Sequence, residues 1–267
     1  MDKAALSAIV ADLTQAASRI TLQHFRAGVS VDNKEADGFD PVTVADREAE
    51  RAMRAVIERT YPDHGIRGEE FPEKPANSPY RWVLDPIDGT RAFICGVPVW
   101  TTLIALEKDG APILGVIDQP RLGERWVGSV LSDDVAELSV VGPITAGTSG
   151  CTSLSSARLM VTDVRTGEYF TDDEAAAVLR LASKVQLTRQ GLDSYGFGLV
   201  ASGQMDLVVE AGLKWHDIAA VIPVIQAAGG VATDWHGHDL RDTGGNVQCI
   251  IAATDELADA ASKVLTA

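Results

Sequence analysis

The sequence predicts an α/β fold, and three observations carry that prediction. Apolar residues near the N-terminus recur at spacings of one, three and four, as in amphipathic helices. From residue 80 onward the pattern changes to short runs rich in valine, isoleucine and tryptophan, which are typical of strands. Beyond residue 157, strand-like and helix-like segments alternate, which indicates a layered α/β arrangement.

Two helices are expected at the N-terminal end. The first is expected to end near Gly28, and its apolar stripe consists of Leu6, Ile9, Val10, Leu13, Ala17 and Ile20. The second follows Thr43-Val44-Ala45-Asp46 and ends at Tyr61-Pro62, because proline cannot continue a helix. Its stripe consists of Ala49, Met53, Val56 and Ile57. Asp46 is therefore predicted at a helix entrance.

Four strands are expected next, in a sheet that is at least partly antiparallel. They are predicted at residues 81–84, 100–107, 113–117 and 125–130. Asp109-Gly110 separates the second strand from the third, and both residues accept the positive dihedrals of a tight hairpin turn.

The second half of the chain begins after a Gly- and Ser-rich stretch at residues 142–156. Strands are predicted at residues 158–161, 206–210 and 247–253, and helices at residues 172–183, 194–201, 217–228 and 256–265. We expect a single domain, 1–267, with an N-terminal lobe of about residues 1–140 and a C-terminal lobe of about residues 141–267.

Composition and charge exclude several classes of partner. The chain has 267 residues, 46% of them hydrophobic, so it can bury a sizeable core. Its formal net charge of -15 argues against binding nucleic acid or an anionic membrane, because the summed field repels a polyanion. An anionic substrate would need a cation as a bridge.

Cysteine usage and hydropathy favour a cytoplasmic protein. Cys95, Cys151 and Cys249 lie far apart and include no C-x-x-C pair, so neither a zinc knuckle nor a disulfide framework is indicated. No apolar run approaches the roughly 18 residues of a membrane span, and no signal peptide is indicated at the N-terminus.

The strongest local signal is Asp85-Pro86-Ile87-Asp88-Gly89-Thr90, which follows an apolar strand. Two carboxylates at a strand end offer hard oxygen ligands for a divalent cation. The amides of Gly89 and Thr90 can hold a phosphate if a helix starts there. When this string is judged without the rest of the sequence, an Asx turn followed by a helix cap explains it equally well.

Two further acidic segments admit the same two interpretations. Gly68-Glu69-Glu70 follows a short apolar run and would present acids at a second strand end, although a solvated surface pair is the commoner case. Asp217 precedes an apolar helix, where helix capping alone would account for it.

Taken together, these strings resemble the inositol monophosphatase superfamily, whose hallmarks are G-E-E, D-P-I-D-G-T-x-x-F and W-D-x-A-A. Here they read Gly68-Glu69-Glu70, residues 85–93 and residues 216–220, in the same order and at similar spacing. The resemblance covers nearly the whole chain, including the string from Asp40 to Asp46. It implies a five-layer αβαβα sandwich, a homodimer, and Mg²⁺-dependent hydrolysis of a small phosphorylated metabolite.

The resemblance also implies roles for individual residues. The metal ligands would be Glu69, Asp85, the carbonyl of Ile87, Asp88 and Asp217, holding two or three Mg²⁺ ions. Asp46, Thr90 and Glu69 would hold and polarise the attacking water, and Gly89 and Thr90 would bind phosphate. One departure is that Trp215 stands two places before Asp217, and His216 occupies the place of the usual tryptophan. We expect His216 to pack or donate a hydrogen bond.

Substrate choice is expected to depend on the C-terminal lobe. Glu210 looks like the substrate-binding glutamate of the superfamily, and Gly191 and Asp193 lie in the segment about seventeen residues before it. An acid at this place, followed by Tyr195 two residues later, is similar to the bacterial histidinol-phosphatase branch, as is Arg91-Ala92-Phe93. Histidinol phosphate carries an ammonium and an imidazole with which Asp193 and Glu210 could pair.

The sequence therefore predicts a phosphatase that removes phosphate from histidinol phosphate, the penultimate step of histidine biosynthesis. An inositol monophosphatase is the alternative, followed by a broad nucleotide or sugar phosphatase. From another class, an inactive metabolite-binding protein could keep the same fold. Asp193 could also merely cap the helix predicted to begin at Ser194.

Overall fold

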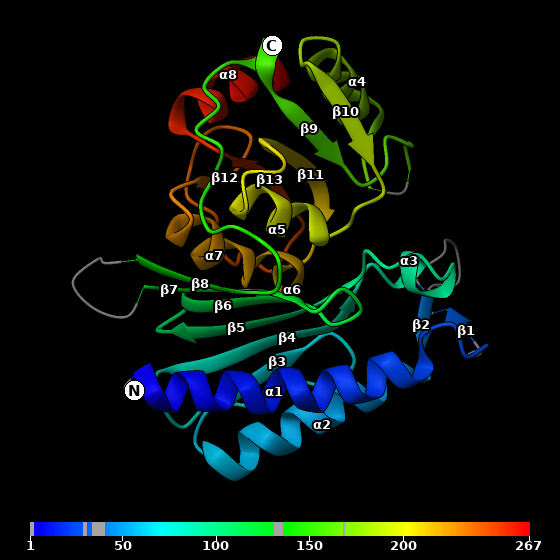
Figure 1. The fold of residues 1–267 in the computed structure, drawn as a ribbon, viewed down its shortest axis with the longest axis vertical. Coiled ribbons are helices and arrows are strands. Elements are labelled where there is room, and N and C mark those ends of the chain that lie inside the picture. The colour runs from blue at the N-terminus through cyan, green and yellow to red at the C-terminus, as the bar shows by residue number, and fades with distance from the viewer. Residues whose placement is uncertain (1–2, 29–30, 34–40, 131–135, 168) are drawn as a thin grey trace.

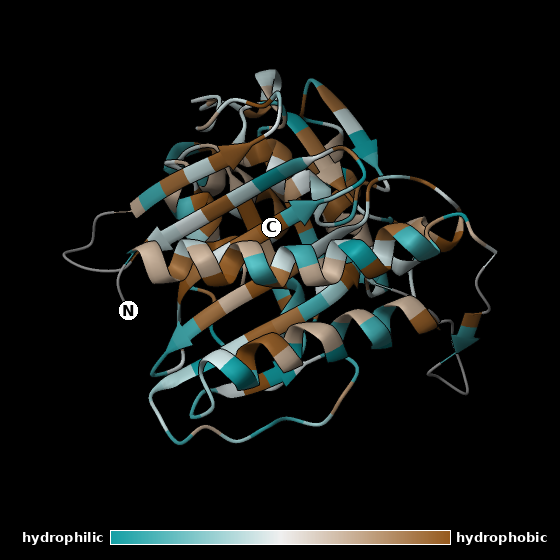
Figure 2. Ribbon diagram, turned by 60° about the horizontal axis from the view of Figure 1, so that its bottom comes forward, coloured by the Kyte–Doolittle hydropathy of each residue, from teal (hydrophilic) through white to brown (hydrophobic). Residues whose placement is uncertain are grey.

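The computed structural model describes residues 3–28, 31–33, 41–130, 136–167 and 169–267, and these form five layers of alternating helices and sheets (Figure 1). The first layer contains α1 (Lys3–His24) and α2 (Val44–Thr60), which pack against each other. Their buried apolar residues, among them Leu13 and Met53, meet Trp82 and Ile104 of the adjacent sheet. Figure 2 shows both helices with brown stretches interrupted by polar ones, which is the amphipathic pattern expected of them.

The second layer is a six-stranded sheet in the order β3-β4-β5-β6-β7-β8. The strands are β3 (Gly65–Gly68), β4 (Tyr80–Asp88), β5 (Thr101–Lys108), β6 (Ala111–Gln119), β7 (Glu124–Val130) and β8 (Ala136–Val141). Only the first pair, β3 and β4, is parallel among the pairs in this sheet. The hairpin predicted at Asp109-Gly110 is confirmed, with φ values of 52° and 84°.

The third layer consists of short helices between the two sheets: α5 (Tyr195–Ala201), α6 (Trp215–Ile218) and α7 (Val221–Ala227). Helix α7 packs directly on β6 and β7. A Cβ added at Gly115 would lie 1.9 Å from the carbonyl oxygen of Ala220, and one at Gly128 would lie 2.3 Å from that of Pro223. Both positions are therefore restricted to glycine by the close approach of this layer.

The fourth layer is a five-stranded sheet in the order β10-β9-β11-β13-β12. Its strands are β9 (Arg158–Val161), β10 (Leu187–Gln190), β11 (Leu207–Leu213), β12 (Val231–Thr233) and β13 (Val247–Ala252). Helices α4 (Asp172–Ala182) and α8 (Asp255–Leu265) cover its outer face as the fifth layer. The predicted five-layer α/β sandwich is confirmed.

The remaining elements are short. They are the two-stranded sheet of β1 (Val31–Asn33) and β2 (Pro41–Thr43), helix α3 (Thr90–Ile94), and the 3-10 turn η1 (Leu154–Ser156). Asp40, the first residue of the string that precedes α2, lies outside the described residues. No helix in the described ranges combines the length and the apolar character that a membrane span requires.

The prediction of one helix over residues 217–228 is wrong. Helix α6 begins earlier, at Trp215, and ends at Ile218, and α7 begins only at Val221. Pro223 explains the break, because it has no N–H to donate to the carbonyl of Ala219 and its ring crowds that carbonyl. Asp217 consequently lies inside a separate single turn, not at the entrance of the longer helix.

Candidate active site

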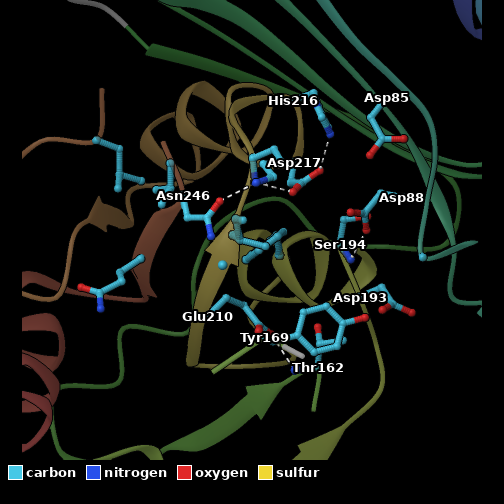
Figure 3. A pocket seen from close by; sticks show the side chains of 18 of the residues that line it. Asp85, Asp88, Thr162, Tyr169, Asp193, Ser194, Glu210, His216, Asp217 and Asn246 are labelled. Carbon is cyan, nitrogen blue, oxygen red and sulfur yellow. Dashed lines mark hydrogen bonds and ion pairs between the residues drawn. The ribbon is translucent and has the colours of Figure 1, made fainter. Parts of the chain in front are cut away.

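Acidic side chains gather where β3 and β4 end. Because these strands are parallel, their carboxyl ends meet at the same edge of the sheet, which brings Glu69 close to Asp85 and Asp88. Asp217 of α6 approaches from the helix layer. Carboxylate oxygens of Asp85, Asp88 and Asp217 all lie within 4.8 Å of one another. Figure 3 shows the three carboxylates around a common space.

A bulge in β4 explains how Asp85 and Asp88 can both face this space. Residues three apart in a regular strand point to opposite faces. The register between β4 and β5 shifts between Asp85 and Asp88, and the added residue returns Asp88 to the side of Asp85. The amide of Ile87 donates to Asp85 Oδ1 at 3.0 Å, so the Asx turn weighed from the sequence is also present.

The electrostatics of this cluster favour a bound cation. Burial and the nearby Glu69 raise the pKa of Asp85 well above its usual value. Burial and Asp217 raise the pKa of Asp88 to about 7. Such shifts mean that the carboxylates repel one another when all are ionised. A divalent cation with hard oxygen preference would relieve this repulsion, so the donor set fits such an ion.

Gly68 allows Glu69 to reach the site. A Cβ at Gly68 would lie 2.0 Å from Glu50 Oε1. Glu50 is fully buried and cannot move away easily, because it accepts hydrogen bonds from Arg54 at 2.7 Å and from the amide of Glu70 at 2.8 Å. The glycine of the Gly68-Glu69-Glu70 string is thus required by the buried carboxylate behind it.

We expect Gly68→Ala to destabilise the protein by about 1–3 kcal/mol, the usual cost of overpacking a buried site. Differential scanning calorimetry of the metal-free protein measures this loss. Gly245→Ala is a matched control, because the nearest atom to its added Cβ lies 3.7 Å away. Equal melting temperatures for the two variants would contradict the role assigned to Glu50.

Asp46 lies one layer behind the acid cluster. It is the third residue of α2, where its Oδ2 accepts from the amide and the hydroxyl of Thr43 in a capping box. Thr90 Oγ1 lies 3.4 Å from Asp46 Oδ1 and donates to the carbonyl of Ile87 at 3.0 Å. Burial raises the pKa of Asp46 to about 6. The structure therefore brings Asp46 and Thr90 together, although Asp46 is not among the residues that line the cavity.

Gly89 connects the acid cluster to the C-terminal half of the chain. Its φ of 86° is in the left-handed region, and it precedes α3 as the N-cap residue. A Cβ at this position would lie 2.9 Å from Asp193 Oδ2. The amide of Ser194 donates to Asp88 Oδ2 at 2.7 Å. Asp193 is therefore adjacent to the predicted phosphate-binding turn.

One cavity of about 1140 Å³ is bordered by the predicted metal and phosphate groups Glu69, Asp85, Ile87, Asp88, Gly89, Thr90 and Asp217. Glu210 lines it from β11 and is buried, and Asp193 lines it while half-buried. Gly191 is not in the cavity lining. It is exposed, and its amide donates to the carbonyl of Thr162 at 3.0 Å. The structure thus brings Asp193 and Glu210 to the cavity with the acid cluster and leaves Gly191 outside.

Glu210 is a buried carboxylate whose strongest charged neighbours are acids. Its Oε1 accepts from the amide of Thr162 at 2.6 Å. Burial, together with smaller contributions from Asp193 and Asp88, raises its pKa to about 8, although the hydrogen bond from Thr162 acts in the opposite direction. A cationic group on a ligand would supply the missing opposite charge.

Glu210→Gln should change how stability depends on pH. An acid whose folded-state pKa is raised contributes stability that is present below its unfolded value and lost as pH rises through the folded value. For Glu210 this stability is lost over a pH window that extends from 4.5, the ordinary pKa of glutamate, to about 8, its pKa in the folded protein. We expect the metal-free wild type and Glu210→Gln to have equal melting temperatures at the acidic end of this pH window. At its alkaline end the variant should melt several degrees higher. Parallel melting curves across this window would contradict the shift.

Tyr169 is a cavity residue that no sequence pattern predicted. It lies in the segment between β9 and α4, and the Arg91 guanidinium packs 5.1 Å from the centre of its ring. Its backbone packs on Gly212, where a Cβ would lie 2.8 Å from the carbonyl of Tyr169. Figure 3 places the ring near Asp193 and Glu210. Only knowledge of the fold could bring this segment to the site.

The altered Trp215-His216-Asp217 string is explained by its contacts. Trp215 is buried, and its Nε1 donates to Glu107 Oε1 at 2.5 Å. His216 Nε2 lies 3.3 Å from Asp217 Oδ1, so the expected hydrogen-bonding role fits its position. The amide of Lys214 donates to the other oxygen of Asp217 at 2.7 Å. Both contacts hold the Asp217 carboxylate toward the cluster.

The five-layer sandwich and the acid cluster between its two sheets define the class of protein. The model of the inositol monophosphatase family matches residues 2–266. The chain belongs to this family.

The names of its relatives are those of phosphatases, and the substrates in these names differ from one relative to another. The chain is 41% identical over 233 residues to the chloroplastic bifunctional phosphatase IMPL2 of Arabidopsis thaliana, a match of 84% of this chain and 63% of that protein. It thus spans less than two thirds of the Arabidopsis protein. It is 38% identical to a histidinol-phosphatase of Chlorobaculum parvum, covering 85% of this chain and 84% of that one. The solved inositol monophosphatase of Zymomonas mobilis has a TM-score of 0.84 and 38% identity, with full coverage of both chains.

Proposed function

We propose that this chain is a Mg²⁺-dependent phosphatase that hydrolyses histidinol phosphate to histidinol and phosphate. One observation carries the proposal: the carboxylates of Asp193 and Glu210 line the same cavity as Asp85, Asp88 and Asp217. The second set fits a divalent cation. The first set fits the positive groups of an amino alcohol, because buried carboxylates require opposite charge or protonation.

The metal-binding part of the proposal involves Glu69, Asp85, the carbonyl of Ile87, Asp88 and Asp217. These groups offer only oxygen atoms, which Mg²⁺ prefers, and their number suits two or three ions. Bound Mg²⁺ supplies positive charge that offsets repulsion between carboxylates and phosphate and makes water more acidic. The proposal thereby accounts for the raised pKa values of Asp85 and Asp88.

The chain's own residues would bind the phosphate and orient the attacking water. The backbone amides of Gly89 and Thr90 are available to the phosphate at the start of α3. Thr90 Oγ1, held between Asp46 and the Ile87 carbonyl, is suited to orient water in line with the ester bond. Asp46, whose pKa is raised to about 6, can accept the proton that this water loses by way of Thr90 Oγ1.

The choice of substrate is supported by charge and by relatives. Histidinol phosphate has an ammonium and an imidazole, and each charge-assisted hydrogen bond is roughly twice as strong as a neutral one. Histidinol-phosphatases of Chlorobaculum parvum and of Mycobacterium tuberculosis are 38% and 33% identical to this chain. An inositol phosphate offers only hydroxyl groups to Asp193 and Glu210.

Inositol 1-phosphate is the second candidate substrate. It is favoured by the 32% identity with the inositol-1-monophosphatase ImpA of Mycolicibacterium smegmatis and by the Zymomonas mobilis structure. A broad phosphatase of sugars or nucleotides would use the same acid cluster. An inactive binding protein is disfavoured, because drift without catalysis would be expected to lose some of the five metal-binding groups.

The test is a comparison of kcat/KM for phosphate release from histidinol phosphate, inositol 1-phosphate and a nucleoside monophosphate. We expect release to require Mg²⁺, to cease with a chelator, and to be fastest with histidinol phosphate. A preference for inositol 1-phosphate would overturn the substrate assignment while leaving the phosphatase. Absence of release from all three with Mg²⁺ would favour a binding protein.

A further inference from the structure

Four alternating charges lie beside the cavity without lining it: Arg67, Arg81, Glu107 and Asp242, here called the Asp242 network. Arg81 and Glu107 are directly opposite each other on β4 and β5, and Arg81 Nε donates to Glu107 Oε2 at 2.6 Å. Glu107 is fully buried, whereas the other three side chains retain 21–27% exposure. Arg81 also pairs with the more exposed Glu73 at 3.5 Å, so three acids surround the two arginines.

Asp242 comes from a distant part of the sequence. It lies between β12 and β13, while Arg67 and Arg81 lie on the neighbouring strands β3 and β4 of the other sheet. Asp242 Oδ2 accepts from Arg67 and, at 3.3 Å, from Arg81. Its Oδ1 accepts from the amide of Gly244 at 3.1 Å, which fixes the local turn. One carboxylate therefore ties the β12–β13 segment to the six-stranded sheet.

The residues on both sides of Asp242 do line the cavity, namely Leu240, Arg241, Thr243 and Asn246. The network also reaches helix α6, which carries the cavity residue Asp217. Glu107 Oε1 accepts a hydrogen bond from Nε1 of Trp215, the first residue of α6. Val83, between Arg81 and Asp85 on β4, packs into the core around α6 and α7, so Arg81 and Asp85 share a strand face. The network thus connects two walls of the cavity to the strand that carries the acid cluster.

We propose that Asp242 is a positioning residue that, through Arg67 and Arg81, holds the cavity-lining segment 239–246 against the acid cluster and so determines how tightly the substrate's alcohol portion binds. The inference rests on the proposed phosphatase function. The proposed phosphate and metal groups lie at the carboxyl ends of β3 and β4 and on α6, whereas segment 239–246 borders another part of the cavity. Release of the segment therefore weakens substrate binding more than it slows hydrolysis.

The test is Asp242→Asn, which keeps Oδ1 as an acceptor for Gly244 and removes the charge that holds the two arginines. We expect KM for the best substrate found with the wild type to rise about tenfold, with kcat within about twofold. Asp242→Glu should recover most of the loss. Asp118→Asn is the matched control: Asp118 also pairs with an arginine of this sheet, 2.6 Å from Arg125, and it is itself buried and lies outside the cavity.

A readout independent of activity is hydrogen exchange of the backbone amides in residues 236–246. These amides should exchange faster than in the wild type in Asp242→Asn and in Arg67→Gln. Their exchange rates should be unchanged in Asp118→Asn. If Arg67 and Asp242 act together, the double variant should be no worse than the more affected single variant. Unchanged exchange and KM in Asp242→Asn would overturn the inference, as would an equal effect of Asp118→Asn.

The two proposals fail in different ways. If the wild type releases no phosphate from any ester, the proposed function fails, and the exchange measurement still tests whether Asp242 holds segment 239–246 in place. If the wild type is active and Asp242→Asn lowers only the melting temperature, Asp242 is merely structural and the proposed function stands.

Discussion

Asp85→Asn is expected to lower the rate of phosphate release by about 10³-fold or more, because a metal contributes several kcal/mol to the stabilisation of transition-state charge. Asp85 is buried on β4 and lies within reach of both Asp88 and Asp217, so its loss removes the group shared by the whole cluster. The asparagine side chain retains Oδ1 as the acceptor for the amide of Ile87. Steady-state rates across a range of Mg²⁺ concentrations measure the effect.

The stability of the metal-free variant separates lost chemistry from lost structure. In the wild type, Asp85 is buried among acids that repel its charged form. Asparagine removes that repulsion, so metal-free Asp85→Asn should melt at or above the wild-type temperature at alkaline pH, and added Mg²⁺ should raise its melting temperature less. Wild-type rates would refute the metal assignment, and a large drop in melting temperature would make the rate uninformative.

The sequence indicated each acid of the cluster, but no local sequence pattern could show that these acids form one site. Each acid could also have had a purely structural role, in a turn, as a helix cap or as a surface residue; these acids are Glu69, Asp85, Asp88 and Asp217. Two facts of the fold combine them: β3 and β4 are parallel, and the register of β4 shifts before Asp88. The predicted strand ended at residue 84, whereas β4 continues through Pro86 to Asp88.

Most elements were predictable because they have amphipathic or alternating patterns. Two of the strands that were not predicted, β8 and β10, lie at sheet edges, where fewer neighbours demand apolar residues. The same limit applies to the cavity. Tyr169 and Asp242 belong to connecting segments without periodicity, and the sheet topology alone brings them to the site. Contacts between a loop and a strand 160 or more residues away leave no local signature.

Asp193→Asn is the second substitution with a large expected effect. Capping of α5 was an alternative role for Asp193, but Ser194 is the N-cap residue and no side-chain cap is formed there. Asp193 itself has a φ of 47° and borders the cavity beside Gly89. Asparagine tolerates this left-handed conformation better than alanine does, so it removes the charge with little backbone strain.

Loss of a charge-assisted hydrogen bond costs about 1.5–3 kcal/mol, so we expect kcat/KM for histidinol phosphate to fall about 10- to 100-fold in Asp193→Asn. Inositol 1-phosphate should lose far less, because it carries no positive group with which the Asp193 carboxylate could pair. The ratio of the two losses distinguishes recognition from structure, since a displaced Gly89 turn would impair phosphate binding for both substrates. Equal losses would therefore assign Asp193 to support of the phosphate turn, and the cationic part of the substrate would have to be recognised by Glu210 alone.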